Sequence, residues 1–193
     1  MLSIAITEEQ VEAALTAGSL ACPGCSGRLS PWGYARSREV RMLDGVRQVT
    51  PRRAYCHGCD ATHVLCPSWS VPRRRDGAEV IGKALRLAVH DGAGHRRIAR
   101  HLGRPPGTVR GWLRAARTRA GSLRACATRW LVSLDPELGA VIPAGSDLGD
   151  AVEAIILAAR AWVLRCGPGQ LGVWERAVLL TGGLLYGQPP VGP

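Results

Sequence analysis

The chain has 193 residues, of which 46% are hydrophobic, so it is long enough for one medium-sized domain or two small ones with a buried core. Its net charge of +10 is concentrated in residues 73–129, which carry 15 basic and 3 acidic side chains, as expected of a surface that faces a polyanion; a solvated arginine-rich face is the alternative interpretation. The most apolar stretch, residues 151–164, contains one glutamate and one arginine, which excludes a membrane span.

The N-terminal residues 1–19 are predicted to form a short helix, which begins with a capping box of Thr7 and Gln10. The opening sequence MLSIAITEEQ has no basic segment before its apolar residues, so no secretory signal is predicted and the cytoplasm is the expected location. Because thiols stay reduced in that compartment, we do not interpret the seven cysteines as a disulfide framework.

Residues 20–72 contain two Cys-x-x-Cys pairs, which can aim four thiolates at one point in the tetrahedron that Zn²⁺ prefers. The sequence VRMLDGVRQV between the pairs predicts a tight hairpin around Asp44-Gly45, with its second strand running on through residues 49–55. This is the layout of a zinc ribbon. The predicted ligands of the Zn²⁺ ion are Cys22, Cys25, Cys56 and Cys59.

Several alternatives remain open at this metal site. His57 or His63 could replace one cysteine as a ligand, and Cys66 follows the second pair closely enough that its membership is not settled. A redox pair of the thioredoxin kind would need a βαβ pattern, which the sequence does not show. Cys66, Cys126 and Cys166 are most simply interpreted as small buried apolar side chains.

Residues 73–134 are predicted to begin with three helices. The first starts at Asp76, with Glu79 closing a capping box, and the second runs from His95 to Leu102 and stops at Gly103. Pro106 suits the first position of the third helix, and Pro105 keeps the residue before it extended, so the two prolines indicate a short rigid turn. The third helix is expected to bury four residues: Val109, Trp112, Leu113 and Ala116.

This pattern predicts a homeodomain-like, three-helix helix-turn-helix domain, whose third helix enters the major groove of double-stranded DNA. The residues expected to face the bases or lie on the adjacent stripe are Pro106, Gly107, Thr108, Arg110, Arg114 and Arg117. The second helix is expected to contact phosphates through His95, Arg96, Arg97 and Arg100. RNA ranks behind duplex DNA as a partner, because the sequence shows no exposed aromatic platform.

Three segments in this order carry a family resemblance: CPGC, a hairpin that ends in RRAYCHGC, and IARHLGRPPGTVRGWLR. They are similar to the zinc-ribbon and helix-turn-helix front end of bacterial insertion-sequence transposases, and they resemble small bacterial proteins that carry this front end alone. The resemblance covers about residues 20–120. It implies recognition of a DNA end or site, with the four paired cysteines as zinc ligands.

The chain departs from those transposases after the third helix, because about 70 residues remain where a large two-metal nuclease domain would be needed. Asp147 and Asp150 form the only close carboxylate pair on one helical segment, and capping explains them at a helix start. No catalytic triad, phosphate loop or small-molecule site is evident. We therefore expect a non-enzymatic DNA-binding protein, such as a transcriptional regulator or an orphan recognition module; the alternative is an accessory subunit of a transposition system acting with a separate nuclease.

The remaining residues are predicted to be helical, which makes the expected fold mainly α with one small β zinc ribbon. A helix over 121–134 should turn Leu123, Ala127, Trp130, Leu131 and Leu134 inward, and residues 135–146 form a loop. A helical hairpin follows over residues 147–186, with helices at 147–166 and 171–186, and residues 187–193 form a disordered tail. The hairpin has two broad apolar faces, which either cover the helix-turn-helix core or form a homodimer; we favour the homodimer.

Overall fold

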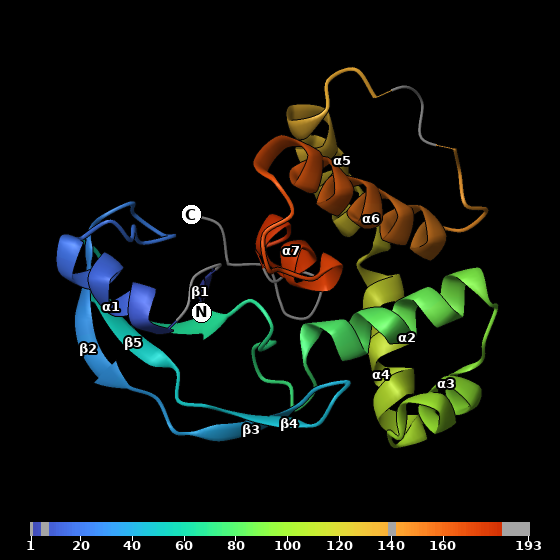
Figure 1. Cartoon of the computed structure of the whole chain (residues 1–193), viewed down its shortest axis with the longest axis horizontal. Coiled ribbons are helices and arrows are strands. Elements are labelled where there is room, and N and C mark those ends of the chain that lie inside the picture. Colours follow the sequence, from blue (N-terminus) through green and yellow to red (C-terminus); the bar gives the residue numbers. More distant parts are fainter. Residues whose placement is uncertain (1, 5–7, 139–141, 183–193) are drawn as a thin grey trace.

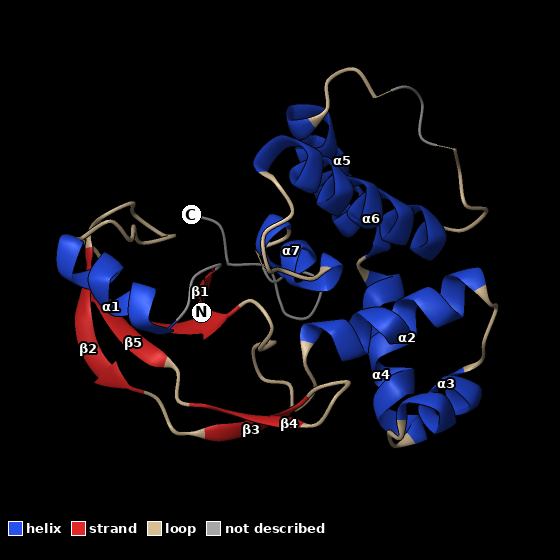
Figure 2. Cartoon of the chain, in the orientation of Figure 1, coloured by secondary structure: helices blue, strands red, loops and turns tan. Residues whose placement is uncertain are grey.

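The computed structural model describes residues 2–4, 8–138 and 142–182 (Figure 1). Within them the fold is mainly α with a small sheet, as predicted (Figure 2). Thr7, residues 183–186 and the predicted tail at 187–193 lie outside the described residues. The elements are β1 (Leu2–Ile4), α1 (Glu8–Ala17), β2 (Leu29–Tyr34), β3 (Arg38–Arg41), β4 (Val46–Val49), β5 (Arg52–Cys56), β6 (Ala61–Pro67), α2 (Ala78–His90), α3 (His95–Leu102), α4 (Pro106–Thr118), α5 (Ala120–Leu134), α6 (Asp147–Cys166) and α7 (Val173–Leu180).

The N-terminal lobe, which we define as the described residues up to Pro67, is built on a four-stranded sheet in the order β1-β6-β5-β2. Strand β5 pairs antiparallel with both β2 and β6, whereas the short β1 pairs parallel with β6. Helix α1 packs on β2 and β5 (Figure 1). Its Val11 and Leu15 are buried against Leu29, Ala54 and Leu65 of the sheet. The first 19 residues therefore contribute a strand as well as the predicted helix.

The predicted hairpin around Asp44-Gly45 is present, with β3 and β4 paired antiparallel from Arg38↔Val49 to Arg41↔Val46. The prediction that its second strand runs on through residue 55 is wrong. Strand β4 ends at Val49 and β5 begins at Arg52, and the two belong to different sheets. Pro51 lies between them, and a proline has no N–H to donate to a continuing ladder.

Helix α3 begins and ends where the sequence predicts, and α4 begins at the predicted residue. Gly103 caps α3 in the left-handed conformation, with φ 61° and ψ 40°, and its N–H donates to Ala99 and Arg100 carbonyls. Pro105 is the N-cap of α4 and Pro106 its first residue. All four residues predicted to point inward from α4 are buried.

The predicted capping box at the start of α2 is wrong. Gly77 is the N-cap, and it has no side chain that could accept a hydrogen bond. The Asp76 carboxylate instead binds two arginines. The Glu79 carboxylate accepts a hydrogen bond from the backbone N–H of Trp174, at 2.9 Å. Both acidic side chains therefore make contacts with distant parts of the chain, which a local capping pattern does not reveal.

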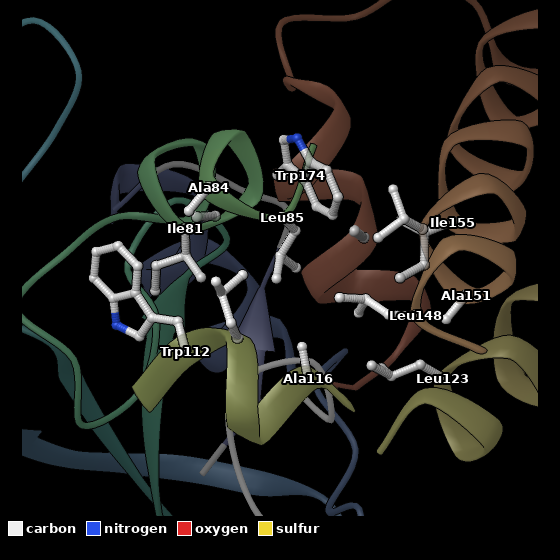
Figure 3. Packing of buried hydrophobic residues seen from close by; sticks show 14 of the residues in the cluster. Ile81, Ala84, Leu85, Trp112, Ala116, Leu123, Leu148, Ala151, Ile155 and Trp174 are labelled. Carbon is white, nitrogen blue, oxygen red and sulfur yellow. The ribbon is translucent and has the colours of Figure 1, made fainter. Parts of the chain in front are cut away.

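The C-terminal helices cover the core of the same chain. Helix α5 packs along α6, and α7 packs against α2 and α6. Figure 3 shows Trp174 of α7 and Ile155 of α6 in one cluster with Leu85 of α2 and Trp112 of α4. This packing buries much of the described part of the two apolar faces, so the fold does not support a homodimer through residues 147–186, which stays a prediction.

Two side chains predicted to be buried are exposed instead. One is Trp130, which is 43% exposed. The buried side of α5 consists of Ala120, Leu123, Cys126, Ala127 and Leu131, and Trp130 lies at its edge. Cys166, at the end of α6, is also exposed rather than buried. Helix α7 begins at Val173 and reaches Leu180, so it is shorter at its start than predicted.

A buried carboxylate joins the hairpin to the turn between α3 and α4. The Asp76 side chain is 3% exposed, with Oδ2 2.6 Å from Arg41 Nη2 and Oδ1 2.6 Å from Arg104 Nε. Arg104 also donates from Nη2 to the Met42 carbonyl, at 3.1 Å. Three segments distant in sequence, namely the hairpin, the start of α2 and the α3–α4 turn, are therefore held at one point.

Replacing Asp76 should destabilise the chain far more than replacing an acidic residue whose arginine partner is exposed. Asp76→Asn leaves two guanidinium groups without their carboxylate, so we expect the free energy of unfolding to fall by about 3 kcal/mol, measured by urea titration. Asp150→Asn is the control, because Asp150 pairs with an Arg124 side chain that is 57% exposed, and its loss should cost about 1 kcal/mol. Equal losses in the two variants would contradict the structural role of Asp76.

The packing of α7 on α2 can be tested with two glycines inside helices. A Cβ at Gly82 of α2 would lie 2.0 Å from the Trp174 ring, so Gly82→Ala should destabilise the chain by about 3 kcal/mol. A Cβ at Gly111 of α4 meets nothing within 4 Å, so Gly111→Ala should stabilise the chain by up to about 1 kcal/mol. Urea denaturation of both variants measures these changes in the free energy of unfolding. If Gly82→Ala leaves it unchanged, Trp174 does not pack on Gly82.

Candidate functional site

The four paired cysteines converge, as the sequence predicts. Cys22 and Cys25 lie in the turns between α1 and β2, whereas Cys56 ends β5 and Cys59 lies in the turn to β6. The four Sγ atoms all lie within 4.8 Å of one another. The Sγ atoms of Cys22 and Cys59 lie 3.6 Å apart and those of Cys25 and Cys56 lie 3.4 Å apart, so each contact joins one cysteine from each pair.

The donor set fits a soft metal ion such as Zn²⁺. Zn–S bonds of about 2.3 Å in a tetrahedron place sulfurs about 3.8 Å apart, close to the spacing seen here. Backbone N–H groups of Gly24 and Gly27 donate to the sulfurs of Cys22 and Cys25, each at 3.4 Å, which stabilises thiolates. A Cβ at Gly27 or Gly58 would lie 3.2 or 3.3 Å from the Cys25 sulfur, so glycines keep the turns close to the cluster.

The protonation of the cluster shows why a cation would stabilise it. The Gly24 N–H lowers the pKa of the Cys22 thiol to about 6. The adjacent thiols of Cys25 and Cys22 raise the pKa of Cys59 to about 12. Four neighbouring thiolates repel one another, so without a cation the group keeps protons at neutral pH. A bound metal ion would displace those protons, and acid would compete with it.

The alternatives for the metal ligands are separated by position. His63 of β6 is buried, and its Nε2 lies 3.3 Å from Cys22 Sγ, outside the four-sulfur group but in place to orient that ligand. His57 is exposed and meets the Tyr55 ring edge-on. Cys66 is buried, which raises the pKa of its thiol, and it is not part of the group that the described residues form. Cys126 is buried as expected.

A basic surface covers α3 and α4. All ten residues predicted to contact DNA are exposed or half-buried: His95, Arg96, Arg97, Arg100, Pro106, Gly107, Thr108, Arg110, Arg114 and Arg117. Six of them are exposed arginines, and none of the six forms an ion pair with a carboxylate in the described part of the chain. No acidic residue occurs between Asp91 and Asp135. These arginines are therefore free to meet an external anion.

Sequence reasoning missed Arg104, whose side chain holds the turn between the two helices of this surface. Its Nε pairs with Asp76, while its Nη1 donates to the Leu102 and Gly103 carbonyls at 3.1 and 3.3 Å. Arg104 thus closes the turn that sets the angle between α3 and α4. Within the run GRPP the residue reads as one more basic side chain, and no local signal distinguishes it.

The expectation that the chain lacks an exposed aromatic platform is wrong. Trp32 is 54% exposed, and its ring stacks on Tyr55 with centroids 5.0 Å apart and planes at 27°. The two residues lie on neighbouring strands, β2 and β5, and 23 positions apart in sequence. Only strand register brings them together, so counting aromatics could not find the pair.

Comparison of the chain with protein-family models, curated proteins and solved structures finds no significant match. Among the described helices, none combines the length and the apolar character needed to cross a membrane. Functional inference therefore rests on the cysteine cluster, the basic surface and the fold that carries them.

The metal site can be tested through Cys59, one of its two exposed ligands. Purified protein should contain about one zinc ion per chain by elemental analysis, and Cys59→Ser should lose most of it, because three ligands remain. Cys66→Ser and Cys166→Ser should keep the metal, since neither thiol belongs to the cluster. Full retention in Cys59→Ser would refute the four-cysteine site, and metal loss in Cys66→Ser would assign Cys66 to it.

Proposed function

We propose that the chain is a non-enzymatic, zinc-containing protein that binds double-stranded DNA in the cytoplasm. In this proposal residues 20–72 form a zinc ribbon and α2–α4 form a helix-turn-helix whose third helix, α4, reads the major groove. The observation that carries the proposal is the capped turn at Gly103–Pro105, which sets two helices at one angle beneath an array of unpaired arginines.

The arrangement of α3 and α4 supports this reading of the groove. The buried residues Ile98, Val109 and Trp112 fix the inner sides of both helices in one core. On α4, Arg110, Arg114 and Arg117 follow at intervals of four and three residues, so they lie along one outward stripe. A guanidinium on such a stripe can make a bidentate contact to the O6 and N7 atoms of guanine. Pro106 and Gly107 offer no side-chain donors, so discrimination between bases would depend on the arginines.

The exposed arginines of α3 support a contact to the phosphate backbone. Arg96, Arg97 and Arg100 have no acidic partner among the described residues and lie one helix away from the proposed reader. Contacts of this kind orient a protein on the duplex without reading its sequence, and they release counterions. Binding should therefore depend steeply on salt concentration.

The N-terminal lobe supports a structural metal. Its larger core cluster has seven buried residues, of which Cys22 and Cys56 are candidate ligands, and a second cluster at the hairpin has three. So small a core supplies little folding energy by itself, and a metal bound only in the folded state would supply more. The zinc would thus stabilise the fold of the lobe and take no part in a reaction.

The carboxylates favour binding over catalysis. Asp150 accepts a hydrogen bond from the Ala144 N–H at 2.7 Å and pairs with Arg124 at 3.1 Å, so it stabilises the start of α6 beside Asp147. A transcriptional regulator or an orphan recognition module similar to the front end of transposases fits these features. The second candidate is an accessory subunit of a transposition system, with a separate nuclease; the front-end resemblance favours it, and a nuclease gene beside this one would support it.

Two arginine substitutions test the proposed division of labour on DNA. Selection from a random duplex pool first identifies a preferred site. Arg110→Ala should weaken binding to that site by about 1–3 kcal/mol and relax the preference at one position. Arg97→Ala should weaken all duplexes alike and reduce the slope of log K against log[salt] by about 1.

Fluorescence anisotropy on the selected and a scrambled duplex, at several salt concentrations, measures both effects. If the two variants change binding to the two duplexes in the same way, α4 does not read the sequence. If neither variant changes binding, the basic surface of α3 and α4 is not the DNA interface.

A further inference from the structure

In the described part of the chain, one face of the N-terminal sheet has no helix packed over its β2 and β5 residues. The other face carries Leu29, Ala54 and Cys56, which α1 covers. Side chains alternate along strands, so the opposite face belongs to the residues between them. The register places Ser30 beside Tyr55, Tyr55 beside Thr62, and Arg53 beside Val64. All five residues are exposed or half-buried, and Trp32 lies at the edge of the same face. We call this set of six residues the open face.

A bulge in β2 places Trp32 and Tyr34 on opposite faces of the sheet, whereas strict alternation would place them on the same face. Pro31 pairs with Ala54 and Tyr34 pairs with Arg52, so two residues of β2 oppose one of β5. Gly33 takes φ +94° there, a conformation that other residues rarely adopt. Tyr34 therefore turns to the α1 side, where its hydroxyl donates to Glu12 and Arg52 lies over its ring. Trp32 stays on the open face.

The aromatic rings of the open face are held in place. Trp32 stacks on Tyr55 at 5.0 Å, and Tyr55 meets the edge of His57 at 4.7 Å. The Tyr55 hydroxyl donates to the Asp60 carboxylate, which fixes the ring from its far end. The Trp32 indole thus has one side supported by Tyr55 while 54% of the residue remains in water. Because the fold already fixes the indole ring, a ligand that stacks on it loses little free energy to ordering the side chain.

We propose that the open face binds single-stranded nucleic acid, with a base stacked on Trp32 and the backbone near Arg53. Bases of every kind have a flat π-face that stacks on an aromatic side chain, and the neighbouring cation suits a phosphate. Arg53 is the charged residue of the open face, and the nearby Asp60 carboxylate already accepts the Tyr55 hydroxyl. Glu12 faces the α1 side and pairs with Arg52.

The composition of the open face favours this ligand over a protein partner. Apart from the two stacked rings and Val64, it presents the polar Ser30 and Thr62 and the cationic Arg53. An extended apolar patch would instead be typical of a protein interface. The site differs from the basic surface of α3 and α4, so it goes beyond the proposed binding of duplex DNA.

The test uses the full zinc-loaded chain and fluorescence anisotropy with labelled oligo(dT) and oligo(U) of about 12 nucleotides, plus a duplex. Trp32→Ala should weaken binding to single strands roughly 10-fold and leave duplex binding unchanged. Trp32→Phe keeps an aromatic ring and should retain most of the affinity. Trp130→Ala is the matched control, because Trp130 is 43% exposed on α5 and distant in sequence from the sheet. Zinc content and circular dichroism confirm that each variant folds.

Arg110→Ala separates this site from the duplex interface, since it should weaken duplex binding and spare single strands. Stronger binding of oligo(U) than oligo(dT) would identify RNA as the source of the strand, and the reverse would identify DNA. Failure of the wild-type chain to bind either oligonucleotide overturns the proposal, as does an equal effect of Trp32→Ala and Trp130→Ala. Self-association that Trp32→Ala abolishes in light scattering also overturns it, because the rings would then form a protein interface.

Discussion

The double ion pair of Asp76 is the interaction on which the arrangement of this molecule depends. A carboxylate that is 3% exposed needs a compensating positive charge. Two arginines supply it: Arg41 of the β3–β4 hairpin and Arg104 of the α3–α4 turn. The backbone reinforces the same point, since the Gly77 N–H donates to the Arg41 carbonyl at 2.9 Å. The hairpin is thereby fixed to the turn that sets the angle of α4.

This junction connects two lobes that have separate cores. The helical cluster holds Ile81, Trp112, Ile155 and Trp174, whereas the N-terminal cluster holds Leu15, Leu29 and Leu65 beside two cysteines. Because no buried residue belongs to both clusters, the polar contacts at Asp76 and the hydrogen bond from Ser68 to Glu175, at 3.0 Å, carry much of the connection. Hydrogen bonds and ion pairs have stricter geometry than apolar packing. These contacts therefore fix the orientation of the two lobes more than they add to stability.

Local signals in the sequence predicted the helical lobe well and the contacts between distant segments poorly. Gly103, Pro105 and Pro106 act through their own backbone preferences, so their roles were evident without the fold. The convergence of the cysteines followed from the short spacing within each pair. Asp76 was misassigned because its partners lie 35 and 28 residues away, and the Trp32–Tyr55 pair depends on the register between β2 and β5, which no spacing rule reveals.

The two proposed nucleic-acid surfaces differ in the interaction that would bind the ligand, and the distribution of charge along the chain agrees with this difference. The α3–α4 surface lies in residues 73–129, where the excess of positive charge suits the high charge density of a duplex. The open face lies in residues 1–72, which carry 7 basic and 6 acidic side chains, so attraction to phosphates is weak there. Stacking on Trp32 would have to supply most of the affinity, and stacking responds less to salt than phosphate contacts do. Asp76 fixes the β3–β4 hairpin, which lies between β2 and β5 in the chain, to the α3–α4 turn, so the segment that joins two strands of the sheet is also anchored beside α4.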